Sequence, residues 1–69
     1  MIDGFVIIIE GGYLGQDGGT SNDLQSARDW QEYEEAEAIA LGVDINPDWI
    51  AEFVIVDGQR QLAYENAAA

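Results

Sequence analysis

Three chemically important residue types are missing from this sequence: cysteine, histidine and lysine. Without cysteine, no disulfide can stabilise the fold and no thiolate can act as a nucleophile. Without histidine, the chain lacks the commonest general base, the usual metal ligand and the side chain that changes charge near neutral pH. Paired carboxylates need an enclosed cleft to act as acid and base, and a chain of 69 residues rarely forms one. We therefore expect a protein that is not an enzyme and that binds no cofactor.

Positive charge is almost absent from the chain. Arg28 and Arg60 stand against fourteen Asp and Glu residues, which gives a formal net charge of −12. Proteins bind nucleic acids by placing clustered Lys and Arg on phosphates, so this chain is not expected to bind DNA or RNA. Anionic membrane surfaces are disfavoured for the same reason. The expected partner is instead a basic surface on another protein or complex.

Long hydrophobic runs are also absent. The apolar run over residues 5–9 is far shorter than the roughly 20 residues that span a bilayer, and no Lys/Arg region precedes it. We expect neither a signal peptide nor a membrane anchor, and a cytoplasmic location, which is the host cytoplasm for a phage-encoded protein. With 48% hydrophobic residues the chain is expected to be globular, and its length allows one core. The prediction is a single acidic domain over residues 1–69, acting as a monomer.

The first half of the chain predicts a strand, a short hairpin and a long helix. β-Branched residues over 2–10 favour a strand, and Gly11-Gly12 can turn the chain back into a short second strand. Glycine and small polar residues over 15–22 indicate a loop. A helix is predicted from there to about Leu41, ended by Gly42. The candidate N-caps of this helix are Ser21, Asn22 and Asp23.

The second half predicts a capped turn followed by a hairpin. Asn46-Pro47 is an N-cap with proline at the first helical position, which indicates a short helical turn through Ala51. Asp57-Gly58 is a strong turn signal between two strands. A two-residue turn there fixes the register, which pairs Phe53 with Leu62 and Ile55 with Arg60 and also brings Tyr64 onto their face. Residues 67–69 are expected to fray.

Together these elements define an α+β fold. We expect a three- or four-stranded, mainly antiparallel sheet with one long acidic helix packed on a face, with or without a second short helix. Trp49 and Ile50 are expected to point inward, and Arg60 is expected to lie at the sheet edge, paired with a carboxylate. The helical residues assigned to the core by their spacing are Trp30, Tyr33, Ala36, Ala40 and Leu41.

The loop before the helix offers several oxygen ligands, in the manner of a calcium-binding loop. They belong to Asp17, Thr20, Ser21 and Asp23. The loop departs from the EF-hand pattern because Gly19 stands at the third ligand position and no bidentate Glu follows at the twelfth position. We interpret it as a flexible loop with a helix cap and expect no metal.

Carboxylates recur along the predicted helix. Steps of three residues would place Asp29, Glu32 and Glu35 about 4.5 Å apart along the axis, in an anionic ridge. Such a ridge is either a solvated face or an imitation of a phosphate backbone, and the charge that continues beyond the helix favours imitation. The predicted partner-binding residues are Asp29, Glu32, Glu34, Glu35, Asp44, Asp48 and Glu52. Exposed charges tune association rate more than affinity, so apolar anchors are also needed, and the candidates are Tyr13, Tyr33 and Trp49.

In its size, its lack of lysine and its acidic helix beside a small sheet, the chain resembles the small phage-encoded DNA-mimic inhibitors. These include anti-CRISPR proteins, which occlude a DNA-binding surface on a Cas complex, and inhibitors of uracil-DNA glycosylase. The resemblance implies an inhibitor whose carboxylates occupy the sites where Lys and Arg would grip phosphates, for instance in PAM recognition by a host defence complex. The alternatives are an ordinary small domain of a halophilic organism, and an acidic structural or interaction subunit whose charge only prevents self-association.

Salt dependence of folding separates the first alternative from the others. We expect a cooperatively folded domain at about 0.15 M salt, because the apolar content is sufficient for a core and exposed charges are already screened beyond about 8 Å. Circular dichroism and thermal melting measure this. A random-coil spectrum that becomes folded only at molar salt would instead indicate a halophilic protein.

Overall fold

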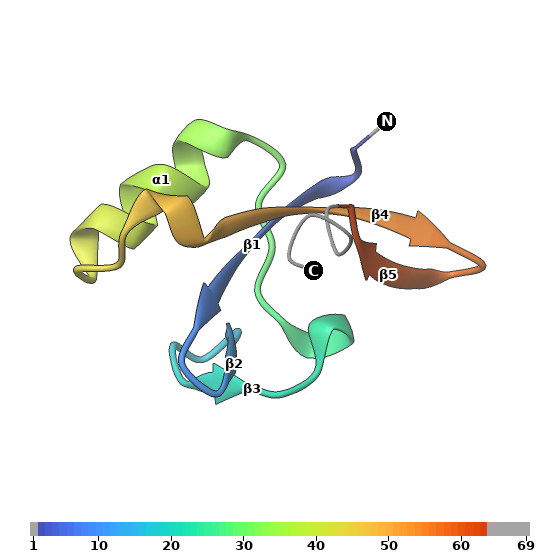
Figure 1. The fold of residues 1–69 in the computed structure, drawn as a ribbon, viewed down its shortest axis with the longest axis horizontal. Coiled ribbons are helices and arrows are strands. Elements are labelled where there is room, and N and C mark those ends of the chain that lie inside the picture. Colours follow the sequence, from blue (N-terminus) through green and yellow to red (C-terminus); the bar gives the residue numbers. More distant parts are fainter. Residues whose placement is uncertain (1, 64–69) are drawn as a thin grey trace.

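The computed structural model of the protein describes residues 2–63 and has an α+β fold, as the sequence predicts (Figure 1). One α-helix and two short 3₁₀ helices accompany a five-stranded antiparallel sheet with the strand order β3-β2-β1-β4-β5. The strands are β1 (Gly4–Ile9), β2 (Gly12–Leu14), β3 (Thr20–Ser21), β4 (Ile50–Val56) and β5 (Gln59–Leu62). The helices are η1 (Leu24–Ser26), α1 (Tyr33–Gly42) and η2 (Pro47–Trp49). The sheet has five strands rather than three or four, because Thr20 and Ser21 pair with β2 inside the expected loop.

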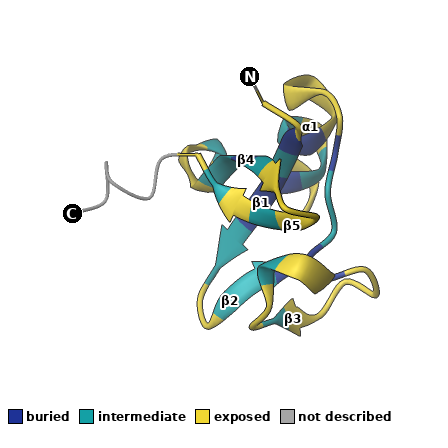
Figure 2. Cartoon of the chain, turned by 90° about the vertical axis from the view of Figure 1, so that its right-hand side faces the viewer, coloured by how far each residue is buried: buried dark blue, intermediate teal, exposed yellow. Residues whose placement is uncertain are grey.

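Strand β1 lies at the centre of the sheet, and both of its faces are covered. Successive side chains of a strand point to opposite faces. Ile7 is accordingly buried in one apolar cluster with Trp30, whereas Val6 is buried in a second cluster with Phe53. Burial on both sides explains why β1 reads as an unbroken apolar run (Figure 2).

The two predicted hairpins are confirmed. Strand β2 returns along β1 through a turn in which Gly11 and Gly12 both have positive φ. The β4–β5 hairpin turns at Asp57 and Gly58, which also have positive φ, as a two-residue turn between twisted strands requires. Its register pairs Phe53 with Leu62 and Ile55 with Arg60, as predicted. Tyr64 and the alanine tail lie outside the described residues.

The predicted long helix is wrong over its first half. Asp23 does act as an N-cap, but it caps only η1, where its carboxylate accepts a hydrogen bond from the Gln25 N–H at 3.0 Å. Residues 27–32, here called the strap, are not helical and pass first the end of β2 and then β1. The backbone of Trp30 in the strap exchanges two hydrogen bonds with Phe5, at 2.8 and 2.9 Å.

Packing explains why the strap is not helical. Ala27 and Trp30 are three residues apart, so an extended chain points them to opposite sides, whereas a helix would bring them onto nearly the same side. Ala27 is buried in the cluster with Val6 and Phe53, and Trp30 is buried in the cluster with Ile7. The strap thus supplies one residue to each cluster, which overrides its weak helical preference.

The helix α1 begins at Tyr33 and ends at the predicted Gly42. Ala36 and Ala40, one helical turn apart, are fully buried in the cluster that contains Ile7. Tyr33 and Leu41, which were also expected in the core, are exposed. The buried residues of α1 are therefore two alanines, with Ile39 packed beside them. The predicted core assignment is confirmed for Trp30, Ala36 and Ala40 and is wrong for Tyr33 and Leu41.

Arg60 joins the β4–β5 hairpin to η1 and the strap. Its guanidinium donates from Nη1 to the carbonyl oxygens of Leu24 and Ala27, at 3.0 and 2.8 Å, and pairs through Nη2 with Asp29 Oδ1 at 3.1 Å. The guanidinium also lies 4.9 Å from the ring centroid of Phe53. The predicted pairing of Arg60 with a carboxylate is confirmed.

Replacing Arg60 with Met should lower the free energy of unfolding by about 1–3 kcal/mol, because Asp29 and two carbonyl groups lose their donor in a partly buried setting. The matched control is Arg28→Met, which removes the same charge. Arg28 lies 5.1 Å from the Trp30 ring centroid, so this control should cost about 0.5–1 kcal/mol. Urea unfolding of both variants measures the difference. We call the contacts of Arg60 with η1 and the strap the Arg60 clamp, and equal losses of stability in the two variants would show that this clamp adds no particular stability.

Candidate partner-binding surface

The seven residues predicted to bind a partner come from five parts of the fold, and they do not form one helical ridge. Asp29 and Glu32 both precede α1, so the row expected at steps of three residues does not exist. Only Glu34 and Glu35 of that set lie within the helix, in its first turn. Asp44 follows α1, Asp48 belongs to η2, and Glu52 belongs to β4.

Asp29 serves the fold rather than the surface. Its carboxylate pairs with Arg60, and the side chain is only 30% exposed. The negative charge of Asp29 is therefore compensated locally, whereas those of Glu32, Glu34 and Glu35 lie on exposed residues. A charge-reversed Asp29 would disrupt the Arg60 clamp, so it is unsuitable for testing a binding surface.

A first group of carboxylates gathers at the start of α1. We call Glu32, Glu34 and Glu35 the helix-start group. Glu32 occupies the N-cap position, although its side chain makes no capping hydrogen bond. Carboxylates in the first turn interact favourably with the helix dipole, by about 0.3–1 kcal/mol each, which offsets their mutual repulsion. This concentration of charge is therefore compatible with a stable helix.

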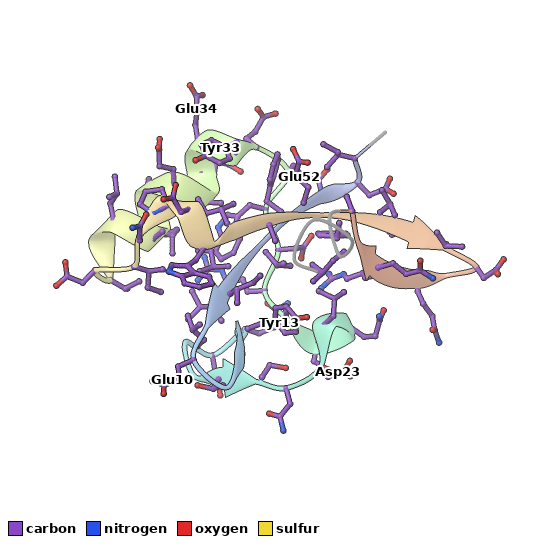
Figure 3. All side chains as sticks on the ribbon, viewed as in Figure 1. Glu10, Tyr13, Asp23, Tyr33, Glu34 and Glu52 are labelled. Carbon is purple, nitrogen blue, oxygen red and sulfur yellow. The ribbon has the colours of Figure 1, made fainter. Side chains whose placement is uncertain are left out.

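Two further residues extend the helix-start group. Tyr33 is exposed and makes an edge-to-face contact with Phe5 of β1, with ring centroids 5.7 Å apart. Glu52 is the β4 partner of Phe5, and its Oε1 is buried without a hydrogen-bond partner among residues 2–63. Figure 3 shows Tyr33, Glu34 and Glu52 on the same side of the molecule. An exposed aromatic ring and several carboxylates thus share this region.

A second acidic region surrounds an open groove at the other end of α1. The groove has a volume of about 640 Å³, and we call it the Trp49 groove. Its lining residues come from the end of β1 and from the segment that connects α1 to β4 through η2. They are Ile8, Ile9, Glu10, Asp44, Ile45, Asn46 and Trp49. Because α1 has ten residues, the two acidic regions are separated along the helix by about 15 Å.

Trp49 is 55% exposed, so its predicted inward orientation is wrong. The predicted capped turn is present, since Asn46 caps η2 by accepting a hydrogen bond from the Asp48 N–H at 2.9 Å. It ends at Trp49 rather than at Ala51, because Ile50 and Ala51 belong to β4 and pair with β1. A 3₁₀ helix has three residues per turn, which points neighbouring side chains about 120° apart. Ile50 begins β4 and packs against the cluster of Ile7, whereas Trp49 lines the groove.

Both basic side chains of the chain are engaged within the fold. Arg60 is clamped to the strap, and its side chain is only 18% exposed. Arg28 is partly buried and stacks on Trp30, which is itself 8% exposed. The ionised side chains on exposed residues in the described part of the chain are consequently carboxylates.

The glycine-rich loop has structural roles for its oxygen atoms. Asp17 Oδ1 accepts a hydrogen bond from the Gly19 N–H at 2.9 Å, and Asp23 caps η1. Between residues 2 and 63, no three Asp or Glu side chains come together in a group that could hold a metal ion. No helix in this part of the chain has the length and apolar character needed to cross a bilayer.

Sequence reasoning missed the Trp49 groove. Tyr13, proposed as an interface anchor, is partly buried and packs against the cluster of Val6 and Phe53. The sequence gives only a weak signal for the groove. The apolar run of β1 continues to Ile9, directly before Glu10, and the sequence does not indicate which segment packs on its last residues. The opposite wall of the groove, from Asp44 to Trp49, depends on the direction in which the chain leaves α1. Local sequence patterns do not specify that direction.

The two tryptophans should differ in their contribution to stability. Trp49→Gln should change the free energy of unfolding by less than about 1 kcal/mol, as for most exposed substitutions. Trp30→Ala should cost about 3–5 kcal/mol, because it removes a buried aromatic ring. Urea unfolding followed by circular dichroism measures both. A large loss for Trp49→Gln would contradict the exposed position of that side chain.

Comparisons with known proteins do not assign the chain to a family. No protein-family model matches it, and neither a curated protein nor a solved structure gives a significant match. The charge distribution and the two surface regions described above are therefore the features that bear on function.

Proposed function

We propose that this protein is an acidic inhibitor that mimics DNA and blocks a basic nucleic-acid-binding surface on another protein. The observation that carries the proposal is the engagement of both arginines within the fold. A surface whose exposed ionic groups are carboxylates repels nucleic acids and attracts the Lys- and Arg-rich surfaces that bind them. The complex blocked in this way is a host defence complex of the anti-CRISPR kind, for which a PAM-recognition site is an example.

The helix-start group is the part of the surface best suited to this role. Its carboxylates project from the first turn of a helix and from the residue before it, so their spacing is fixed by a regular backbone. The partner's Lys and Arg side chains would otherwise hold phosphates by charge-assisted hydrogen bonds, and carboxylates accept the same bonds. The charge also steers association, which makes binding fast and dependent on ionic strength.

Competition with DNA tests the proposal. The immobilised protein is incubated with nuclease-treated lysate of its host, and the captured proteins are identified at low and high salt. We expect a captured protein that itself binds DNA, and we expect duplex DNA to displace it from the column. Fluorescence anisotropy with labelled DNA should then show competition that weakens steeply as salt rises. Captured proteins that bind no nucleic acid, or direct binding of DNA by the acidic chain, would contradict the proposal.

Matched triple variants separate recognition from net charge. Glu32, Glu34 and Glu35, all changed to Gln, should weaken the competition by at least about tenfold. The control changes Asp3, Asp17 and Asp57 to Asn, which removes the same charge from three scattered exposed positions. This control should weaken competition by less than about threefold. Equal losses would show that the helix-start group is only solvated surface, as in a halophilic or purely structural acidic domain.

A further inference from the structure

The Trp49 groove combines an apolar floor with an acidic rim. Ile8, Ile9 and Ile45 line it and are partly buried, while Trp49 is exposed beside them. We propose that this groove receives an apolar side chain from a cationic polypeptide segment, in which Lys or Arg residues flank the inserted residue. The inference rests on the proposed function only in taking the partner to be a basic protein.

The shape of the groove supports an inserted side chain. Its volume of about 640 Å³ falls within the range of about 300–1,000 Å³ found for ligand-binding pockets. Exposed apolar surface that is concave and rimmed by polar groups marks interaction sites in monomeric proteins. Trp is also the residue type most enriched among the side chains that dominate binding energy. Leu41 and Val43, at the end of α1, add exposed apolar surface in the same part of the chain.

Charge decides which occupant fits. Glu10 and Asp44 belong to the lining, and Asp48 lies next to Trp49 in η2. A second copy of this chain also carries a charge of −12, so the long-range interaction opposes self-association. A segment with Lys or Arg beside its apolar residue fits both the acidic rim and the apolar floor of the groove. Charge then provides fast association, and the inserted side chain provides the affinity that exposed charges alone do not.

The wall of the groove is already held in place. The Ile45 N–H donates to the Ala40 carbonyl at 2.7 Å, and Asp44 has the left-handed φ of 65° that turns the chain out of α1. The Asn46 cap then fixes η2, which carries Trp49. A groove bounded by such contacts needs little reorganisation on binding, and this raises affinity.

Three acetylated and amidated hexapeptides test the proposal in about 0.15 M salt. They are Lys-Lys-Leu-Leu-Lys-Lys, the same peptide with both leucines replaced by serine, and Glu-Glu-Leu-Leu-Glu-Glu. Dissociation constants come from calorimetry, and amide chemical shifts locate the peptide. The lysine–leucine peptide should bind at least about tenfold more tightly than the other two. The shifts it causes should centre on residues 8–10 and 44–49.

Variants of the protein provide matched controls. Trp49→Gln should weaken binding of the lysine–leucine peptide by at least about tenfold, whereas Ile55→Gln, which alters a side chain of similar exposure on the distant hairpin, should leave it within about twofold. Asp44→Asn should weaken binding more than Asp57→Asn. Asp44 and Asp57 are both exposed and both have positive φ, so their variants share the same backbone constraint and charge change.

Each contrary result has a defined meaning. Equal binding of the leucine and serine peptides would overturn the apolar part of the proposal, and equal binding of the acidic peptide would overturn the cationic part. Concentration-dependent dimerisation in sedimentation that Trp49→Gln abolishes would show that the groove binds a second copy of the chain. That result would also overturn the proposal. Groove binding by the lysine–leucine peptide without DNA competition would refute the proposed function alone, and competition without leucine preference would refute the groove alone.

Discussion

The fold depends on the guanidinium of Arg60, which links the C-terminal hairpin to η1 and the strap, two consecutive segments much earlier in the sequence. It holds the β4–β5 hairpin to η1 and to the strap through two carbonyl groups and the carboxylate of Asp29. The backbone of Arg60 adds two hydrogen bonds with the side-chain amide of Gln25, at 2.8 and 2.9 Å. These bonds cover the outer edge of β5 at that residue, which would otherwise be open to pairing with another chain. The strap held in this way contributes Ala27 to one cluster and Trp30 to the other.

The same interaction shapes the surface. A chain with a net charge of −12 has two cations to distribute, and both are placed where they stabilise packing. Repulsion among the remaining carboxylates destabilises a compact state, and the fold reduces it by setting Glu34 and Glu35 at a helix N-terminus. The result is an anionic region at each end of α1, one beside an exposed tyrosine and the other around an apolar groove. Under the proposed function, these two regions would offer a basic partner both charge and apolar contacts.

The sequence predicts the parts of the fold that local chemistry determines. The β4–β5 register follows from Asp57-Gly58, because a two-residue turn allows one pairing and a strand alternates with period two. The start of the helix does not follow, because Asp23 caps one 3₁₀ turn as well as it would cap an α-helix. What decides the outcome is the pairing of Trp30 with Phe5, a contact between residues 25 positions apart. The predicted ridge is wrong for the same reason, because it required Asp29 to lie on the helix. The Trp49 groove could not be predicted because it depends on the turn after α1.

Proton exchange at the two guanidinium groups, followed by NMR at neutral pH, tests the central role of Arg60 most directly. Protons held in hydrogen bonds to buried acceptors exchange with water only when the structure opens locally. The Arg60 protons should therefore exchange at least about tenfold more slowly than those of Arg28, and they should show nuclear Overhauser contacts with the Phe53 ring. Equally fast exchange at both arginines, without contacts to Phe53, would contradict the clamp and with it the account of the anionic surface.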